Sequence, residues 1–352
     1  MTTQTAPAQS SAPLLAPLRA TPAQNVVTIV LGFWLMVGIF IDGWAHNHLG
    51  TRLETFFTPW HAIFYSGFAA TALWVGVLAR RGLQSGRRGL AALPVGYTLG
   101  AAGVVVFALG GLGDMLWHTL FGIEVSIDAL LSPTHLLLFL GAELLVLSPL
   151  MSSWHAPTPR HSPAGVVWPA VLSMTAALSF ASFMHMYAWA LVQLPDASGW
   201  EGARSFLTST LLTAVMLMVP VLLLLRRWQL PFGAVTVLYL TNTLLMRAMT
   251  SGLDTVPVVL LLALLAGLAA DVLIWWLQPS PGRPLQYRAF ATALPLLVWA
   301  PFFIGGQRFG GFGASLELTA GVCVMAALAG LALSTLIVPP ALPEAAQERP
   351  GR

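Results

Sequence analysis

The sequence predicts an all-α, polytopic membrane protein, a bundle of about ten transmembrane helices. Of its 352 residues, 57% are hydrophobic and only 8% are charged. Soluble globular domains carry about 25% charged residues, so this chain cannot cover a water-facing surface with charge. Its apolar runs are long and do not alternate with polar residues. Because backbone polar groups in lipid must pair within their own element, these runs are predicted to be helices.

The predicted elements begin after residues 1–24, whose Ala, Pro, Ser, Thr and Gln content indicates a disordered tail. Ten apolar runs follow, each near the length of about 20 residues that a membrane-crossing helix needs. These runs cover residues 26–47, 59–80, 92–119, 132–151, 164–193, 206–226, 232–250, 255–277, 288–305 and 316–338.

Four regions are distinguished along the chain. Residues 25–155 contain a repeated motif and are interpreted as a duplicated helix-pair region with one or two metal sites. Residues 156–340 contain the remaining helices and are interpreted as scaffold. The tails, residues 1–24 and 341–352, are predicted to lie in the cytoplasm.

The distribution of arginine predicts the orientation, since all 16 basic residues are Arg. With ten spans and both termini in the cytoplasm, 12 arginines fall on the cytoplasmic side and 4 outside, as the positive-inside rule requires. The cytoplasmic set is Arg19, Arg80, Arg81, Arg87, Arg88, Arg160, Arg226, Arg227, Arg283, Arg288, Arg349 and Arg352, and the external set is Arg52, Arg204, Arg247 and Arg308. The protein is therefore expected to be a multi-pass protein of the cell (plasma) membrane.

Two features exclude other classes of function. No basic run is interleaved with aromatic residues, so a nucleic-acid partner is not expected. The single cysteine, Cys323, lies inside an apolar run, which excludes an intramolecular disulfide and a cysteine-based metal site.

A cluster of polar residues ends the third apolar run and begins the fourth. Asp114 and His118 are four residues apart, so they share one face of a helix. Ser132 fits the N-cap of the next helix, and Pro133 fits its first position, where a missing N–H costs nothing. His135 is then in the first turn, where the helix dipole disfavours imidazolium. It should stay neutral, the form that binds metal.

The same order of residues occurs earlier in the chain. Asp42 and His46 lie near the end of the first run, and Thr58, Pro59 and His61 occupy the start of the second. The predicted topology places both copies near the external face. Ionisable groups in a membrane are costly and usually functional. Six residues are therefore predicted metal ligands: Asp42, His46, His61, Asp114, His118 and His135.

The types of ligand indicate which metal ions the predicted sites would bind. Two imidazoles and a carboxylate suit copper, with zinc or iron as alternatives. Further residues are candidates for extra ligands or for groups that orient the imidazoles: His48, Glu54, Glu124, Asp128, Glu143 and His185.

The segment Asp114-Met-Leu-Trp-His118 with Ser132-Pro-Thr-His135 resembles the metal motif in the C subunit of particulate methane and ammonia monooxygenases. Glu54-Thr-Phe-Phe-Thr58-Pro-Trp-His61 resembles that family's acidic stretch ending in Phe-Thr-Pro-x-His. The resemblance covers residues 40–140. It implies copper bound within the membrane by the Asp and two His of the second copy, and more weakly by those of the first.

The chain also departs from that family. The motif occurs twice, the gap between His118 and His135 is long, and the first copy has Ala45 before its histidine. The chain has more spans, and no counterpart of the soluble copper-bearing subunit is present in it. A copper-like site is therefore better supported than oxidation of methane or ammonia.

The sequence thus predicts an integral membrane metalloprotein with a copper-preferring His/Asp site near the external face and a redox, monooxygenase-like role. Three other functions use the same residues: a metal-ion or small-solute transporter, a zinc-dependent membrane hydrolase, and a structural or assembly subunit without metal. The expected partners are the lipid bilayer and either partner subunits or further copies of the chain.

Overall fold

The computed structural model describes residues 16–49, 56–122, 127–191, 196–250, 256–310 and 313–340. Regular structure within these ranges is helical, as the composition predicts. The helices are α1 Pro22–Leu49, α2 Pro59–Gln84, α3 Thr98–Phe121, α4 Ile127–Leu131, α5 Pro133–Val146, α6 Ser148–Trp154, α7 Ala164–Met184, α8 Gly199–Arg227, α9 Ala234–Thr250, α10 Val256–Leu277, α11 Pro284–Gly305 and α12 Leu316–Ile337. Nine helical segments among the described residues are long and apolar enough to cross a membrane, with α5 and α6 together counted as one of them.

Helix α9 corresponds to the seventh predicted span, residues 232–250, and is not among these nine. Its 17 residues reach about 26 Å at 1.5 Å per residue, a little less than the roughly 30 Å of a bilayer core. Asp271 of α10 is buried and accepts hydrogen bonds from the backbone N–H groups of Val235 and Thr236, each over 3.1 Å. A side chain from the neighbouring helix thus satisfies donors that the first turn of α9 leaves unpaired.

Several helix bounds differ from the predicted spans. Helix α1 begins at Pro22, inside the predicted tail, and α3 begins at Thr98, after a 3-10 turn at Gly89–Ala92. The fourth span is two helices, α5 and α6, separated at Leu147. Pro149 explains this break, since proline lacks the N–H that would continue the α5 hydrogen-bond ladder.

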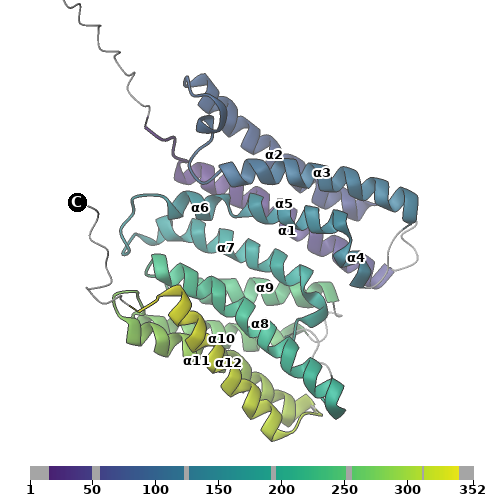
Figure 1. The fold of residues 1–352 in the computed structure, drawn as a ribbon, viewed down its shortest axis with the longest axis vertical. Helices are drawn as coiled ribbons and strands as arrows, with labels where there is room; N and C mark the ends of the chain where they lie inside the picture. The colour runs from purple at the N-terminus through teal and green to yellow at the C-terminus, as the bar shows by residue number, and fades with distance from the viewer. Residues whose placement is uncertain are drawn as a thin grey trace, which may run out of the picture.

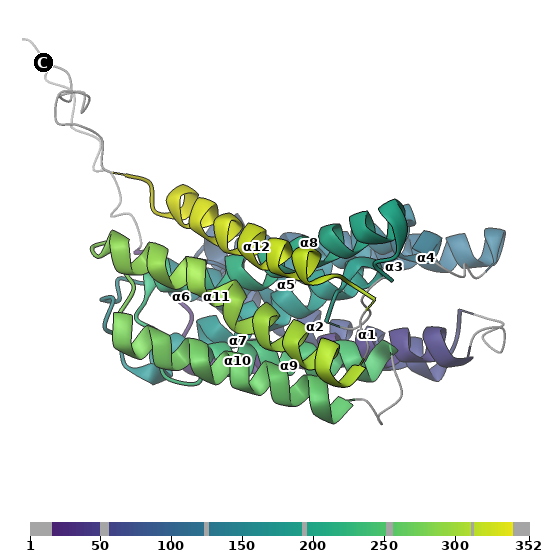
Figure 2. The same ribbon diagram turned by 90° about the horizontal axis from the view of Figure 1, so that it is seen from below.

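The bundle brings both copies of the motif to one end. Figure 2 shows the C-terminal end of α1 and the short α4 at one end of the molecule, and the C-terminal end of α12 at the other. Helix α1 packs along α2, and α3 packs along α5 (Figure 1). Helix α7 lies beside α1, α5 and α9, so it joins these two pairs to the remaining helices.

Glycines hold each of these pairs at close range. A Cβ atom on Gly38 of α1 would lie 2.6 Å from the Cα of Phe64 in α2. A Cβ on Gly141 of α5 would lie 2.6 Å from the backbone nitrogen of Phe107 in α3. Small residues let helix backbones approach in this way in membrane proteins. The close packing carries the ends of α1 and α3 to the beginnings of α2 and α5.

Candidate metal centre

The second copy of the motif forms a compact triad of Asp114, His118 and His135. Asp114 Oδ1 lies 3.4 Å from His118 Nε2 and 3.1 Å from His135 Nε2. One ligand atom from each residue lies within 4.8 Å of the other two. Asp114 and His118 are buried, and the side chain of His135 is 25% exposed. The triad is therefore enclosed by protein on one side and accessible at His135.

The surrounding residues fix the orientation of this triad. Tyr65 of α2 donates to Asp114 Oδ2 over 3.4 Å, and Thr134 donates to Asp114 Oδ1 over 3.1 Å. His118 Nδ1 lies 3.2 Å from the carbonyl oxygen of Gly122. Because a carbonyl only accepts, Nδ1 carries a proton, so in the neutral ring Nε2 presents its lone pair to the triad. Gly122 ends α3 with a φ of +84°, a conformation that favours glycine.

The first copy forms a looser triad of Asp42, His46 and His61. His46 Nε2 is 3.7 Å from Asp42 Oδ2, and His61 Nδ1 is 3.7 Å from Asp42 Oδ1. Their ligand atoms also lie within 4.8 Å of one another. Asp42 and His61 are buried, whereas the side chain of His46 is 30% exposed. This triad, too, has one accessible side.

The predicted helix starts are confirmed and position a histidine in each triad. Thr58 Oγ1 accepts from the backbone N–H of His61 over 3.1 Å, and Ser132 Oγ accepts from that of His135 over 3.3 Å. A proline follows each capping residue at the first helical position. In the first copy, Thr58 Oγ1 also lies 2.8 Å from His61 Nδ1, the nitrogen that faces Asp42.

The two triads lie side by side, an arrangement that spacing in the sequence does not predict. The ring centroids of His61 and His118 are 6.4 Å apart. Phe56 stacks on His61 at 5.1 Å and lies 6.2 Å from His118. Tyr65, one turn after His61 on α2, reaches Asp114 of the other triad. Helix α2 therefore supplies both a residue of one triad and a hydrogen bond to the other.

The separations within the triads fit a bound metal ion. Two ligands about 2.0–2.1 Å from a tetrahedral ion lie about 3.4 Å apart. The measured contacts of 3.1 and 3.4 Å in the second triad, and 3.7 Å in the first, are close to that value. One buried atom in each triad, Asp42 Oδ1 and His118 Nε2, has no hydrogen-bond partner among the described residues. Buried polar atoms normally have one, and a metal ion would satisfy both.

The other candidate residues lie outside the triads. His48 is exposed, and its Nδ1 is 2.8 Å from the carbonyl of Trp44, on which its ring stacks. His185 ends α7 with Nδ1 2.7 Å from the carbonyl of Ala181. Asp128 is exposed on α4, and Glu143 lies on α5 two turns beyond His135. Glu54 and Glu124 lie outside the described residues.

Sequence reasoning missed three groups of the site: Tyr65, Thr134 and the carbonyl of Gly122. Tyr65 follows His61 by four residues, so the shared helix face was a usable signal. Thr134 stands between two residues that the motif already identified, Pro133 and His135. Nothing in the sequence indicates the partner of His118 Nδ1, because that contact depends on how α3 ends.

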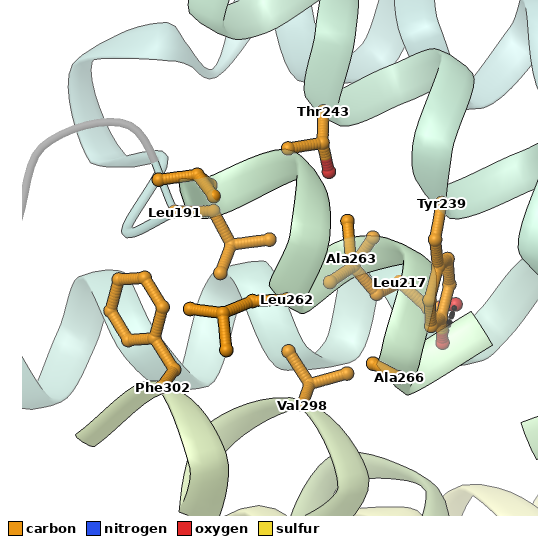
Figure 3. Close-up of a pocket in the computed structure, with 10 residues that line it drawn as sticks. Leu191, Leu217, Tyr239, Thr243, Leu262, Ala263, Ala266, Val298 and Phe302 are labelled. Carbon is orange, nitrogen blue, oxygen red and sulfur yellow. Dashed lines mark hydrogen bonds between the residues drawn. The ribbon is translucent and has the colours of Figure 1, made fainter. Parts of the chain in front are cut away.

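An apolar cavity elsewhere offers no comparable chemistry. It lies between α8, α9, α10 and α11, far along the chain from both triads (Figure 3). The hydroxyl of Tyr239 is already paired, since it donates to the Leu217 carbonyl over 3.3 Å. The lining contains no metal-ligating side chain and consists of Leu191, Leu217, Tyr239, Thr243, Val259, Leu262, Ala263, Ala266, Val298 and Phe302.

Fold and site together define a class: a helical protein suited to cross a membrane many times, with two adjacent His/Asp triads of metal-binding geometry. Comparison of the chain with protein-family models, curated proteins and solved structures gives no match.

Proposed function

We propose that this protein is an integral membrane metalloprotein that binds metal at the Asp42 and Asp114 triads. One observation carries the proposal. Two triads with the same order of residues each contain a buried atom, Asp42 Oδ1 or His118 Nε2, that has no hydrogen-bond partner in the described structure. Leaving a buried polar group unpaired costs about 1–3 kcal/mol, so two such atoms facing other ligands favour a site that a cation completes.

The proposed metal is copper. Imidazole is a good ligand for copper, and the second triad matches the copper motif that the sequence resembles. Zinc and non-haem iron also use two histidines and a carboxylate, so elemental analysis must decide the metal. Each triad has one partly exposed histidine, His46 or His135, which supports an open side where a small or lipid-soluble substrate meets the metal. We propose a redox, monooxygenase-like role on this basis.

The proposed topology has ten spans, the nine long helical segments and α9, and both termini in the cytoplasm. The asymmetry of the arginines supports this orientation. The triads then face the extracytoplasmic side of the plasma membrane, since they lie at the end of the bundle opposite the end of α12 (Figure 2).

A purely structural role for the Asp–His contacts is less well supported. Hydrogen bonds between nitrogen and oxygen are about 2.7–3.2 Å long. The two Asp–His contacts of the first triad, both 3.7 Å, are longer than this, and His118 Nε2 of the second triad makes no hydrogen bond to the described residues. If these Asp and His side chains served only to join helices, they would be expected to lie within hydrogen-bonding distance of each other.

The test is metal content. The protein is purified in detergent, and bound metals are measured by mass spectrometry for the wild type, for His118→Ala with His135→Ala, and for His46→Ala with His61→Ala. Wild type should retain copper, and each double variant should lose part of it. His48→Ala is the matched control, because this exposed histidine is two residues from His46 and outside the triad. Wild-type protein that stays metal-free after loading with copper, zinc and iron would refute the proposal.

A further inference from the structure

The two triads are close enough for their charges to interact, and this bears on which ions they take. Each triad contributes one carboxylate, from Asp42 or Asp114, and two imidazoles. The nearest ring centroids of the two triads, those of His61 and His118, are 6.4 Å apart. The ring of Phe56 packs against both imidazoles. Charges at this range, with protein between them and little screening by water, interact strongly.

We propose, on the basis of the function proposed above, that the triads form one electrostatically coupled pair that takes two monovalent metal ions together but opposes a second divalent ion. With neutral imidazoles, an empty triad carries a net charge of about −1. A monovalent ion makes it neutral, and a divalent ion makes it +1. The second divalent ion must therefore enter beside a positive neighbour, whereas the second monovalent ion enters beside a neutral one.

Coulomb's law predicts the ratio of the coupling energies for divalent and monovalent ions, and this ratio does not depend on the local dielectric constant. The interaction between two bound ions scales with the product of their charges, which is four for two divalent ions and one for two monovalent ions. The logarithm of the coupling, measured as the fold-change in one site's affinity when the other site is filled, should therefore be about four times larger for divalent ions.

The geometry also predicts which of the two sites binds a metal ion first. In the Asp114 triad the contacts are 3.1 and 3.4 Å, Tyr65 and Thr134 hold the carboxylate, and Gly122 fixes the tautomer of His118. In the Asp42 triad the contacts are 3.7 Å, and the facing nitrogen of His61 also contacts Thr58. A preorganised site binds more tightly, so the Asp114 triad fills first.

The experiment compares Zn²⁺ with Ag⁺, neither of which changes oxidation state during the titration. Both are titrated by calorimetry into the detergent-purified wild type and into His118→Ala with His135→Ala, which keeps the Asp114 carboxylate but removes that site's imidazoles. The coupling is the affinity of the Asp42 triad in the variant divided by the affinity for the second ion in wild type. For Zn²⁺ this ratio should be on the order of 100-fold or more, or the second ion should not bind measurably. For Ag⁺ its logarithm should be about one quarter as large.

His48→Ala is the matched control, since it removes an exposed imidazole outside the triads. It should leave both couplings unchanged. The reverse variant, His46→Ala with His61→Ala, should bind one ion with the affinity of the first wild-type step, because the Asp114 triad fills first. Folding of both double variants is judged by circular dichroism. Equal couplings for Zn²⁺ and Ag⁺, or two zinc ions of independent affinity, would overturn this proposal while leaving metal binding intact. Absence of any metal binding would instead refute the proposed function.

Discussion

Tyr65 in α2 donates a hydrogen bond to Asp114 in α3 over 3.4 Å, and this contact links the two triads. Tyr65 lies one turn after His61, a residue of the first triad, yet its hydroxyl holds the carboxylate of the second. Helices α2 and α3 pack mainly on their own partners, α1 and α5, and meet each other through aromatic contacts such as Tyr65 with Phe107. Tyr65 therefore fixes the position of one helix pair relative to the other where the ligands meet.

Replacing Tyr65 with phenylalanine should weaken metal binding at the Asp114 triad by about 10- to 100-fold, the usual effect of removing a group that orients a ligand. The ring keeps its packing against Phe64 and Phe107, so the fold should be retained. Metal titration of the purified variant measures the loss. The exposed Tyr187→Phe is the control and should bind metal like wild type. An unchanged affinity in Tyr65→Phe would show that Thr134 alone positions Asp114.

The helix caps give a second prediction, in which two equivalent substitutions lower stability but only one of them also lowers metal affinity. Ser132→Ala removes the oxygen that accepts from the His135 N–H, and Ser315→Ala removes the equivalent cap of α12, which accepts from Leu318. Each change should cost about 1 kcal/mol of stability, measured by thermal unfolding in detergent. Only Ser132→Ala should also weaken metal binding, because its helix begins with a ligand. Equal loss of metal affinity in both variants would contradict the assigned role of the cap.

How much of this site the sequence could predict depends on how local each contact is. The pairs Asp42/His46 and Asp114/His118 follow from helical spacing, and the Thr58 and Ser132 caps follow from the residues after them. These predictions are confirmed because each involves only a few consecutive residues. The approach of His61 to His118 and the bond from Tyr65 to Asp114 could not be predicted. They depend on the crossing of α2 and α3, which tertiary packing sets.

The glycine contacts between α3 and α5 give a third prediction. Gly141→Ala should destabilise the protein by roughly 1–3 kcal/mol, the range for overpacking a tight core, because its Cβ would lie 2.6 Å from the nitrogen of Phe107. The two helices must separate to admit it. Metal affinity at the Asp114 triad should then fall, since α3 supplies two of its residues and α5 the third. Gly76→Ala in α2 is the control, because a Cβ there meets nothing within 4 Å. Similar effects of the two substitutions would show that this approach does not set the spacing of the ligands.

The final prediction concerns the side of the membrane on which the triads lie. Cys323 is the single cysteine, so a Cys323→Ser background permits labelling at chosen sites. Asp128→Cys places a thiol on exposed α4, near the triads, and Ser85→Cys places one between the arginine pairs at the other end of α2. A membrane-impermeant maleimide applied to intact cells should label position 128 and not position 85, because the arginine-rich loops are retained in the cytoplasm. Both thiols should react after the membrane is dissolved in detergent, which controls for their reactivity. Labelling of position 85 in intact cells would reverse the orientation and place the metal centre on the cytoplasmic side.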